Sequence, residues 1–137
     1  MKVSQRLEYA CRAMIQLQKS CQGNQVSRVD DLAEKENLSS TFLVQILNDL
    51  RRAGLVQSRR GKMGGYCLAK DAKDITLGMI VRAIEGGILE LDSDRTGESG
   101  PRVADLWKDI GENLESKMAS ITLEDMVGKA ESLEYYI

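Results

Sequence analysis

Residues 39–69 of this chain read SSTFLVQILNDLRRAGLVQSRRGKMGGYCLA, and the spacing of their apolar residues changes in the middle. Up to Gly54 the apolar residues recur at helical spacing, with Ser39 as the N-cap and Leu43, Ile46, Leu47 and Leu50 on the inner face. After Gly54 the apolar residues alternate on both sides of 60–65, a basic segment rich in glycine. The sequence therefore predicts a helix followed at once by a β-hairpin with a basic tip.

Two helices are predicted before this segment. Residues 4–20 carry apolar side chains at helical spacing. Ser27, followed three residues later by Asp30, resembles a capping box that opens a short helix ending near Asn37. Because so few residues separate this helix from the next, residues 27–54 are a candidate helix-turn-helix.

Residues beyond the hairpin predict a helix that begins after Thr76 and ends at Gly86. An acidic, glycine-containing loop follows, and a long helix begins at Pro101. Thr122 is the predicted cap of a last short helix. The long helix carries a stripe formed by Val103, Leu106, Trp107, Ile110, Leu114, Met118 and Ile121.

That apolar stripe is too long for so small a domain to cover. The chain has 137 residues, which corresponds to one domain or to one small domain with an oligomerisation arm. A partner helix in a homodimer would bury the stripe. The alternative is packing within one chain, against the helix at 4–20.

Charge is distributed unevenly along the chain. Residues 1–70 contain 12 Lys and Arg against 6 Asp and Glu, whereas residues 71–137 contain 7 against 15. A basic half within an acidic protein suggests a surface that faces a polyanion such as nucleic acid. The alternative is a chance distribution of solvated charges.

Composition excludes most enzyme chemistry. The chain has no histidine, which removes imidazole acid–base catalysis and zinc sites that need an imidazole. Cys11, Cys21 and Cys67 form no Cys-x-x-Cys pair, and the glycine run matches no nucleotide-binding motif. We therefore expect no enzyme. The sparse cysteines and the absence of a long apolar run predict a cytoplasmic protein with no membrane partner.

The predicted second helix of the helix-turn-helix supplies candidate DNA contacts. Gln45 can pair with adenine through two hydrogen bonds, and Val44 can contact a thymine methyl group. Arg51 and Arg52 suit phosphate contacts, and the basic hairpin tip suits a narrow minor groove. The alternatives are polar residues that simply face water and a purely structural hairpin. The expected contacts are Ser39, Ser40, Thr41, Val44, Gln45, Asn48, Arg51, Arg52, Arg59, Arg60 and Lys62.

These segments resemble one known family over almost the whole chain. The chain is similar to the IscR/NsrR/CymR (Rrf) family of winged-helix repressors, and the hairpin directly after the Gly54 turn is the most specific match. The resemblance implies a homodimer that binds a partly palindromic DNA operator, with the long C-terminal helices crossing at the interface. It rests on Asp31-Leu32-Ala33, Phe42-Leu43-Val44-Gln45-Ile46-Leu47, Leu50-Arg51-Arg52-Ala53-Gly54-Leu55-Val56, Arg60-Gly61-Lys62-Met63-Gly64-Gly65-Tyr66 and Glu85-Gly86.

Two departures from the family pattern affect the interpretation. Members that sense iron–sulfur status or nitric oxide hold three cysteines in the loop that corresponds to residues 88–100, and this loop has none. We therefore expect no cofactor; the alternatives are a cluster with unusual ligands or oxidation of Cys21. Val44 stands where family members often have Glu before Gln45, so the operator sequence cannot be transferred.

Among members without loop cysteines, the chain most resembles CymR, the repressor of cysteine metabolism. Leu106-Trp107, the segment 122–125 and the terminal Tyr135-Tyr136-Ile137 have counterparts there. The resemblance implies cysteine synthase as a partner, because its active site accepts an acidic C-terminal peptide ending in Ile. The alternative is a frayed hydrophobic terminus that packs on the dimer.

Together these observations predict a mainly α fold with a small β-hairpin wing and a long C-terminal dimerisation helix. The expected domains are a winged helix-turn-helix at 1–85 with its wing at 55–70, an acidic loop at 86–100, and a dimerisation segment at 101–137. We expect a homodimeric DNA-binding repressor. The alternative is a winged helix that docks a protein and not DNA.

Overall fold

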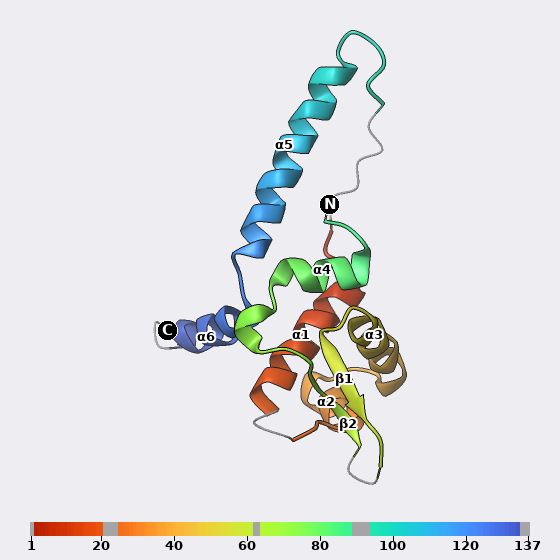
Figure 1. Ribbon diagram of the computed structural model, residues 1–137, viewed down its shortest axis with the longest axis vertical. Coiled ribbons are helices and arrows are strands. Elements are labelled where there is room, and N and C mark those ends of the chain that lie inside the picture. Colours follow the sequence, from red (N-terminus) through yellow and green to blue (C-terminus); the bar gives the residue numbers. More distant parts are fainter. Residues whose placement is uncertain (1, 21–24, 62–63, 89–93, 135–137) are drawn as a thin grey trace.

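The computed structural model describes residues 2–20, 25–61, 64–88 and 94–134. A helical body carries a two-stranded hairpin at one end, and one long helix extends from the other end (Figure 1). No helix within the described segments has both the length and the hydropathy needed to cross a membrane. The elements are α1 (Gln5–Ser20), α2 (Val29–Glu36), α3 (Ser40–Arg52), β1 (Val56–Arg59), β2 (Gly65–Leu68), the 3-10 turn η1 (Ala72–Asp74), α4 (Leu77–Glu85), α5 (Gly100–Ala119) and α6 (Leu123–Glu134).

The core forms between α1, α3 and α4. The four residues predicted for the inner face of α3 are only 0 or 1% exposed, and Met14 and Leu17 of α1 are fully buried beside them. Tyr9 of α1 and Phe42 of α3 meet edge to face, with ring centroids 5.7 Å apart. The predicted mainly helical fold with a small hairpin is confirmed.

Polar caps and left-handed residues fix most helix ends where the sequence places them. The Ser4 hydroxyl accepts a hydrogen bond from the backbone N–H of Leu7, and the Thr76 hydroxyl accepts one from Met79. Asn37 ends α2 with a φ of 57°, and Gly86 ends α4 with a φ of 82°.

The start of α2 lies one residue beyond the cap predicted at Ser27. The residue before α2 is Arg28, whose side chain makes no capping hydrogen bond. The backbone of Ser27 pairs with Tyr66 in an antiparallel bridge. A contact with a segment far along the chain thus helps to fix the position of Ser27, which the local pattern assigned to the helix cap.

The long helix α5 leaves the body, whereas α6 returns to it (Figure 1). α5 packs its C-terminal end against α4, and Val103, Leu106 and Ile110 are 50, 57 and 40% exposed. Of the two C-terminal helices, α6 makes the larger contact with α1, and its Leu123 is fully buried. The structure therefore leaves much of the apolar stripe of α5 uncovered in a single chain.

A short backbone bridge fixes the junction between α5 and α6. The N–H of Leu77 donates to the carbonyl of Ile121, and the N–H of Leu123 donates to the carbonyl of Ile75, each at 2.8 Å. Thr76 and Thr122 face each other between these bonds. The C-terminal end of α5 is thus held beside the N-terminal end of α4.

Candidate nucleic-acid interface

A tight turn sets the angle between α2 and α3. The backbone N–H of Leu38 donates to the carbonyl of Ala33 at 2.8 Å, which completes the left-handed end of α2 at Asn37. Ser39 then caps α3 by accepting from the N–H of Phe42 at 3.5 Å. α3 begins three residues after Asn37, so the two helices form the predicted helix-turn-helix.

The outward face of α3 is polar except for one valine. Thr41 and Gln45 are exposed, Val44 is 36% exposed, and Asn48 is half-buried. These residues lie opposite the buried leucines and isoleucine of the same helix. Of the side chains predicted to reach bases, Thr41, Val44 and Gln45 are therefore accessible, whereas Ser40 and Asn48 are half-buried.

Ser40 joins the two helices of the helix-turn-helix. Its hydroxyl donates to the carboxylate of Asp30 in the first turn of α2, at 2.9 Å. The hydroxyl oxygen keeps its lone pairs as acceptors, so Ser40 can still accept a hydrogen bond from an amino group. The sequence predicts a DNA contact at Ser40 but gives no sign of this link to Asp30.

The C-terminal end of α3 is tied to α1. Asp49 pairs with Arg6 of α1 and, at 3.5 Å, with Arg52 one turn later. Arg51 and Arg52 are exposed in the last turn, where positive charge also complements the helix dipole. Exposed pairs of this kind contribute little to stability, so Arg52 can exchange Asp49 for a phosphate at low cost.

The hairpin has a regular register that ends at a glycine turn. Val56 pairs with Leu68 and Arg59 pairs with Gly65, while the N–H of Gly64 donates to the carbonyl of Gly61 at 2.9 Å. Gly61 has a φ of 117°, which side chains other than glycine rarely adopt. Arg59 and Arg60 are exposed beside this turn, and Lys62 lies outside the described residues.

A second bridge attaches the hairpin to the helix-turn-helix. Ser27 and Tyr66 exchange two backbone hydrogen bonds of 2.8 Å directly before α2. The approach is so close that a Cβ on Gly65 would lie 2.4 Å from the Ser27 carbonyl oxygen. The adjacent glycines Gly64 and Gly65 are the sequence signal of this contact, although they do not reveal its partner.

Exposed arginines lie at the ends of several elements of the helix-turn-helix and the wing. Arg28 precedes α2, Arg51 and Arg52 end α3, and Arg59 and Arg60 end β1. The hairpin and α2 lie at the end of the body opposite α5 (Figure 1). Arginine side chains suit phosphate contacts, and polar side chains on an exposed helix face suit base edges.

An exposed helix of a helix-turn-helix beside a basic two-stranded wing defines a winged-helix DNA-binding protein. The chain belongs to the Rrf2 family, described as "Iron-dependent Transcriptional regulator", whose match spans residues 3–129.

Individual relatives agree with this assignment in sequence and in structure. The transcriptional regulator CymR of Bacillus subtilis is 36% identical over 141 residues, covering 100% of both chains. Its structure, titled as that of the global cysteine regulator, has a TM-score of 0.82 at 35% identity and covers 94% of this chain and 98% of that one. IscR of T. potens has a TM-score of 0.79 at 35% identity, covering 97% of this chain and 90% of that one. The family and these relatives are transcriptional regulators and not enzymes.

The segment 88–100 lacks the thiolates of an iron–sulfur site. Such clusters need several thiolates, and residues 88–100 contain no cysteine. Cys67 is buried in β2, and burial together with the charge of Glu8 raises the pKa of Cys11 to about 11, which disfavours its thiolate. Within the described parts of the chain, no cluster of three or more Cys, Asp or Glu side chains is suited to a metal ion.

Proposed function

We propose that this Rrf2 regulator is a homodimeric, cytoplasmic repressor that binds a partly palindromic operator through α3 and the wing. The observation that carries the proposal is the bridge between Ser27 and Tyr66, which ties the basic wing to the segment that opens the helix-turn-helix. A rigid pair of elements can enter the major groove and the adjacent minor groove together. We assign DNA contacts to Ser39, Ser40, Thr41, Val44, Gln45, Asn48, Arg51, Arg52, Arg59, Arg60 and Lys62.

The DNA-binding experiment compares a wing residue with a residue on α3. An operator is first selected from a random duplex pool, and binding is then measured by fluorescence anisotropy over a range of salt. Arg60→Ala should weaken binding to every duplex and lower the salt slope by about 1. Gln45→Ala should change sequence preference more than general affinity, at a cost of about 1–3 kcal/mol on the preferred operator.

Lys108→Ala is the matched control for lost charge, because Lys108 is exposed on α5 at the other end of the molecule. It should bind the operator as the parent does. Parental binding by both Arg60→Ala and Gln45→Ala would contradict the assignment. A salt-insensitive complex with a protein, together with no duplex binding, would favour the protein-interaction alternative.

We propose that α5 forms the dimer interface. Val103, Leu106 and Ile110 supply an exposed apolar face on a helix with few contacts of its own, and soluble proteins usually cover such faces. Leu106→Asp should shift the mass measured by light scattering from dimer to monomer. Asp109→Asn, an exposed change on the same helix, is the control and should stay dimeric.

We further propose that the regulator controls cysteine or sulfur metabolism and carries no iron–sulfur cluster. The similarity to CymR supports the first part, and the missing thiolates at 88–100 support the second. Protein purified without oxygen should be colourless and free of iron and sulfide while still binding duplex DNA. Visible absorption with bound iron would contradict this, and replacing each cysteine in turn would then identify the ligands.

Cysteine synthase is the protein partner we propose for the C-terminus. The proposal rests on the similarity to CymR and on the acidic sequence of 131–137, of which 135–137 lie outside the described residues. Calorimetry should detect binding of cysteine synthase to the full chain and lose it when Tyr135–Ile137 are deleted. Equal binding by the truncated chain would refute a role for this terminus.

A further inference from the structure

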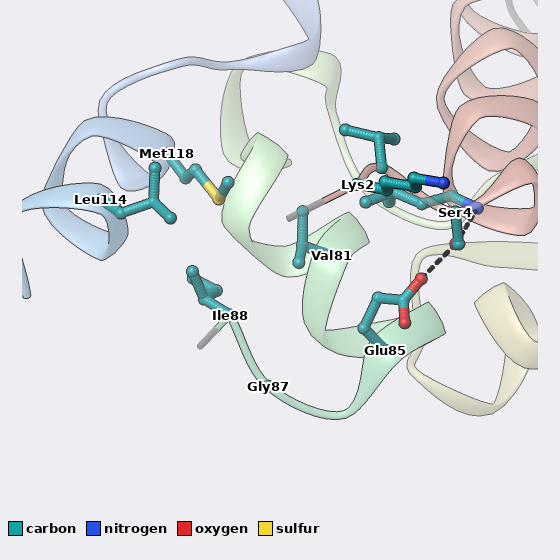
Figure 2. A pocket seen from close by; sticks show the side chains of 10 residues that line it. Lys2, Ser4, Val81, Glu85, Gly87, Ile88, Leu114 and Met118 are labelled. Carbon is teal, nitrogen blue, oxygen red and sulfur yellow. Dashed lines mark hydrogen bonds between the residues drawn. The ribbon is translucent and has the colours of Figure 1, made fainter. Parts of the chain in front are cut away.

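A pocket of about 480 Å³ lies where three segments meet: residues 2–7, the C-terminal end of α4 and the second half of α5 (Figure 2). Small-molecule sites typically enclose about 300–1,000 Å³. None of the described residues that line this pocket belongs to α3 or to the wing. The DNA interface therefore does not account for it.

One side of the pocket is aliphatic. Leu114 and Met118 lie one turn apart on α5 and face Val81 of α4 and Ile88 (Figure 2). Val3 and Leu7 complete the apolar wall, which contains no aromatic ring among its described residues. Such a wall suits a branched or unbranched aliphatic chain, because it offers dispersion contacts but no ring for stacking.

The other side carries two opposite charges. The Glu85 carboxylate ends α4 and accepts a hydrogen bond from the Ser4 hydroxyl, and the Lys2 side chain lies next to Ser4 (Figure 2). Among the described residues, neither Lys2 nor Glu85 forms an ion pair. A carboxylate has about four acceptor positions, so Glu85 can accept from an ammonium group while it holds Ser4.

We propose that this pocket binds a small aliphatic α-amino acid, such as leucine, isoleucine or methionine. The amino group pairs with Glu85, the carboxylate pairs with Lys2, and the side chain lies against Leu114 and Met118. Lys2 and Glu85 are both exposed, so water solvates each charge in the absence of a ligand. A zwitterion complements both charges and the aliphatic wall, whereas an anion without an amine would place its charge beside Glu85.

The test uses the full chain without DNA, so that its outcome is independent of the proposed operator binding. L-leucine, L-isoleucine and L-methionine are each titrated by calorimetry and by thermal unfolding at millimolar concentration. At least one should bind saturably and raise the unfolding temperature. 4-Methylpentanoate, which lacks the amine of leucine, and isoamylamine, which lacks its carboxylate, should bind at least about tenfold more weakly.

Glu85→Gln should weaken binding of the amino acid about tenfold, because it removes the charge but keeps an acceptor for Ser4. Glu112→Gln is the matched control, since Glu112 is exposed on α5 and does not line the pocket. It should bind as the parent does. The proposal is overturned if none of the three amino acids binds, if 4-methylpentanoate binds equally well, or if Glu85→Gln has parental affinity.

Discussion

Replacing Gly65 with alanine tests whether the wing is held to the helix-turn-helix by the backbone bridge. The added Cβ would lie 2.4 Å from the carbonyl oxygen and 2.8 Å from the carbonyl carbon of Ser27, so the two segments must separate. Two backbone hydrogen bonds are then lost, each with a net value of about 1 kcal/mol. Because Ser27 is only 7% exposed, water cannot fully replace its partners. We expect a loss of about 2–4 kcal/mol in the free energy of unfolding.

The assay is urea denaturation followed by circular dichroism at one fixed protein concentration. Gly128→Ala is the control, because Gly128 lies in α6 with nothing within 4 Å of an added Cβ. This change should stabilise the protein by about 0.5–1 kcal/mol. A Gly65→Ala protein within about 0.5 kcal/mol of the parent would refute the reasoning. Operator affinity should fall with the loss of the bridge, even though Gly65 has no side chain to contact DNA.

Two further changes probe the core. Leu123→Ala should cost about 2–5 kcal/mol of unfolding free energy, because Leu123 is fully buried where α6 packs on α1; a loss below about 1 kcal/mol would contradict that packing. Burial raises the pKa of Cys11 from 9.0 to about 11, with a smaller contribution from Glu8, so Cys11 contributes stability below pH 9.0 that is lost as the pH rises through 11. The stability advantage of the parent over Cys11→Ala should therefore shrink by about 2–3 kcal/mol over this range, and a constant difference would show that the thiol is not buried.

Local patterns predicted the parts of the fold that depend on neighbours in sequence. The inner face of α3, the cap at Thr76 and the glycine stop at Gly86 each follow from residues within one or two helical turns. The exposed face of α3 follows equally directly, because the buried residues leave only one other side. Residues 39–69 therefore contained most of what was needed to place the candidate DNA interface.

Features built from distant segments could not be predicted in this way. Ser27 and Asp30 fit a capping box locally, and only the position of Tyr66 decides that the backbone of Ser27 pairs with the wing. The pocket combines residues 2–7, the end of α4 and Leu114 with Met118, and no periodicity connects these segments. The packing of α6 on α1 could not be predicted from the sequence either, because a short apolar pattern does not say which surface will bury it.

The bridge between Thr76 and Thr122 fixes the C-terminal base of α5, so α5 can tilt about this base as a lever tilts about its pivot. α5 has 20 residues and so a length of about 30 Å, and a tilt of about 5° at its base moves its far end by about 3 Å. In the proposed dimer the two paired α5 helices set the distance between the two α3 helices. This distance must match half-sites spaced by about 34 Å. The pocket lies beside this fixed junction, where Leu114 and Met118 meet α4. A small molecule bound there would tilt α5 close to its base, and the displacement would be largest at the far end of the helix.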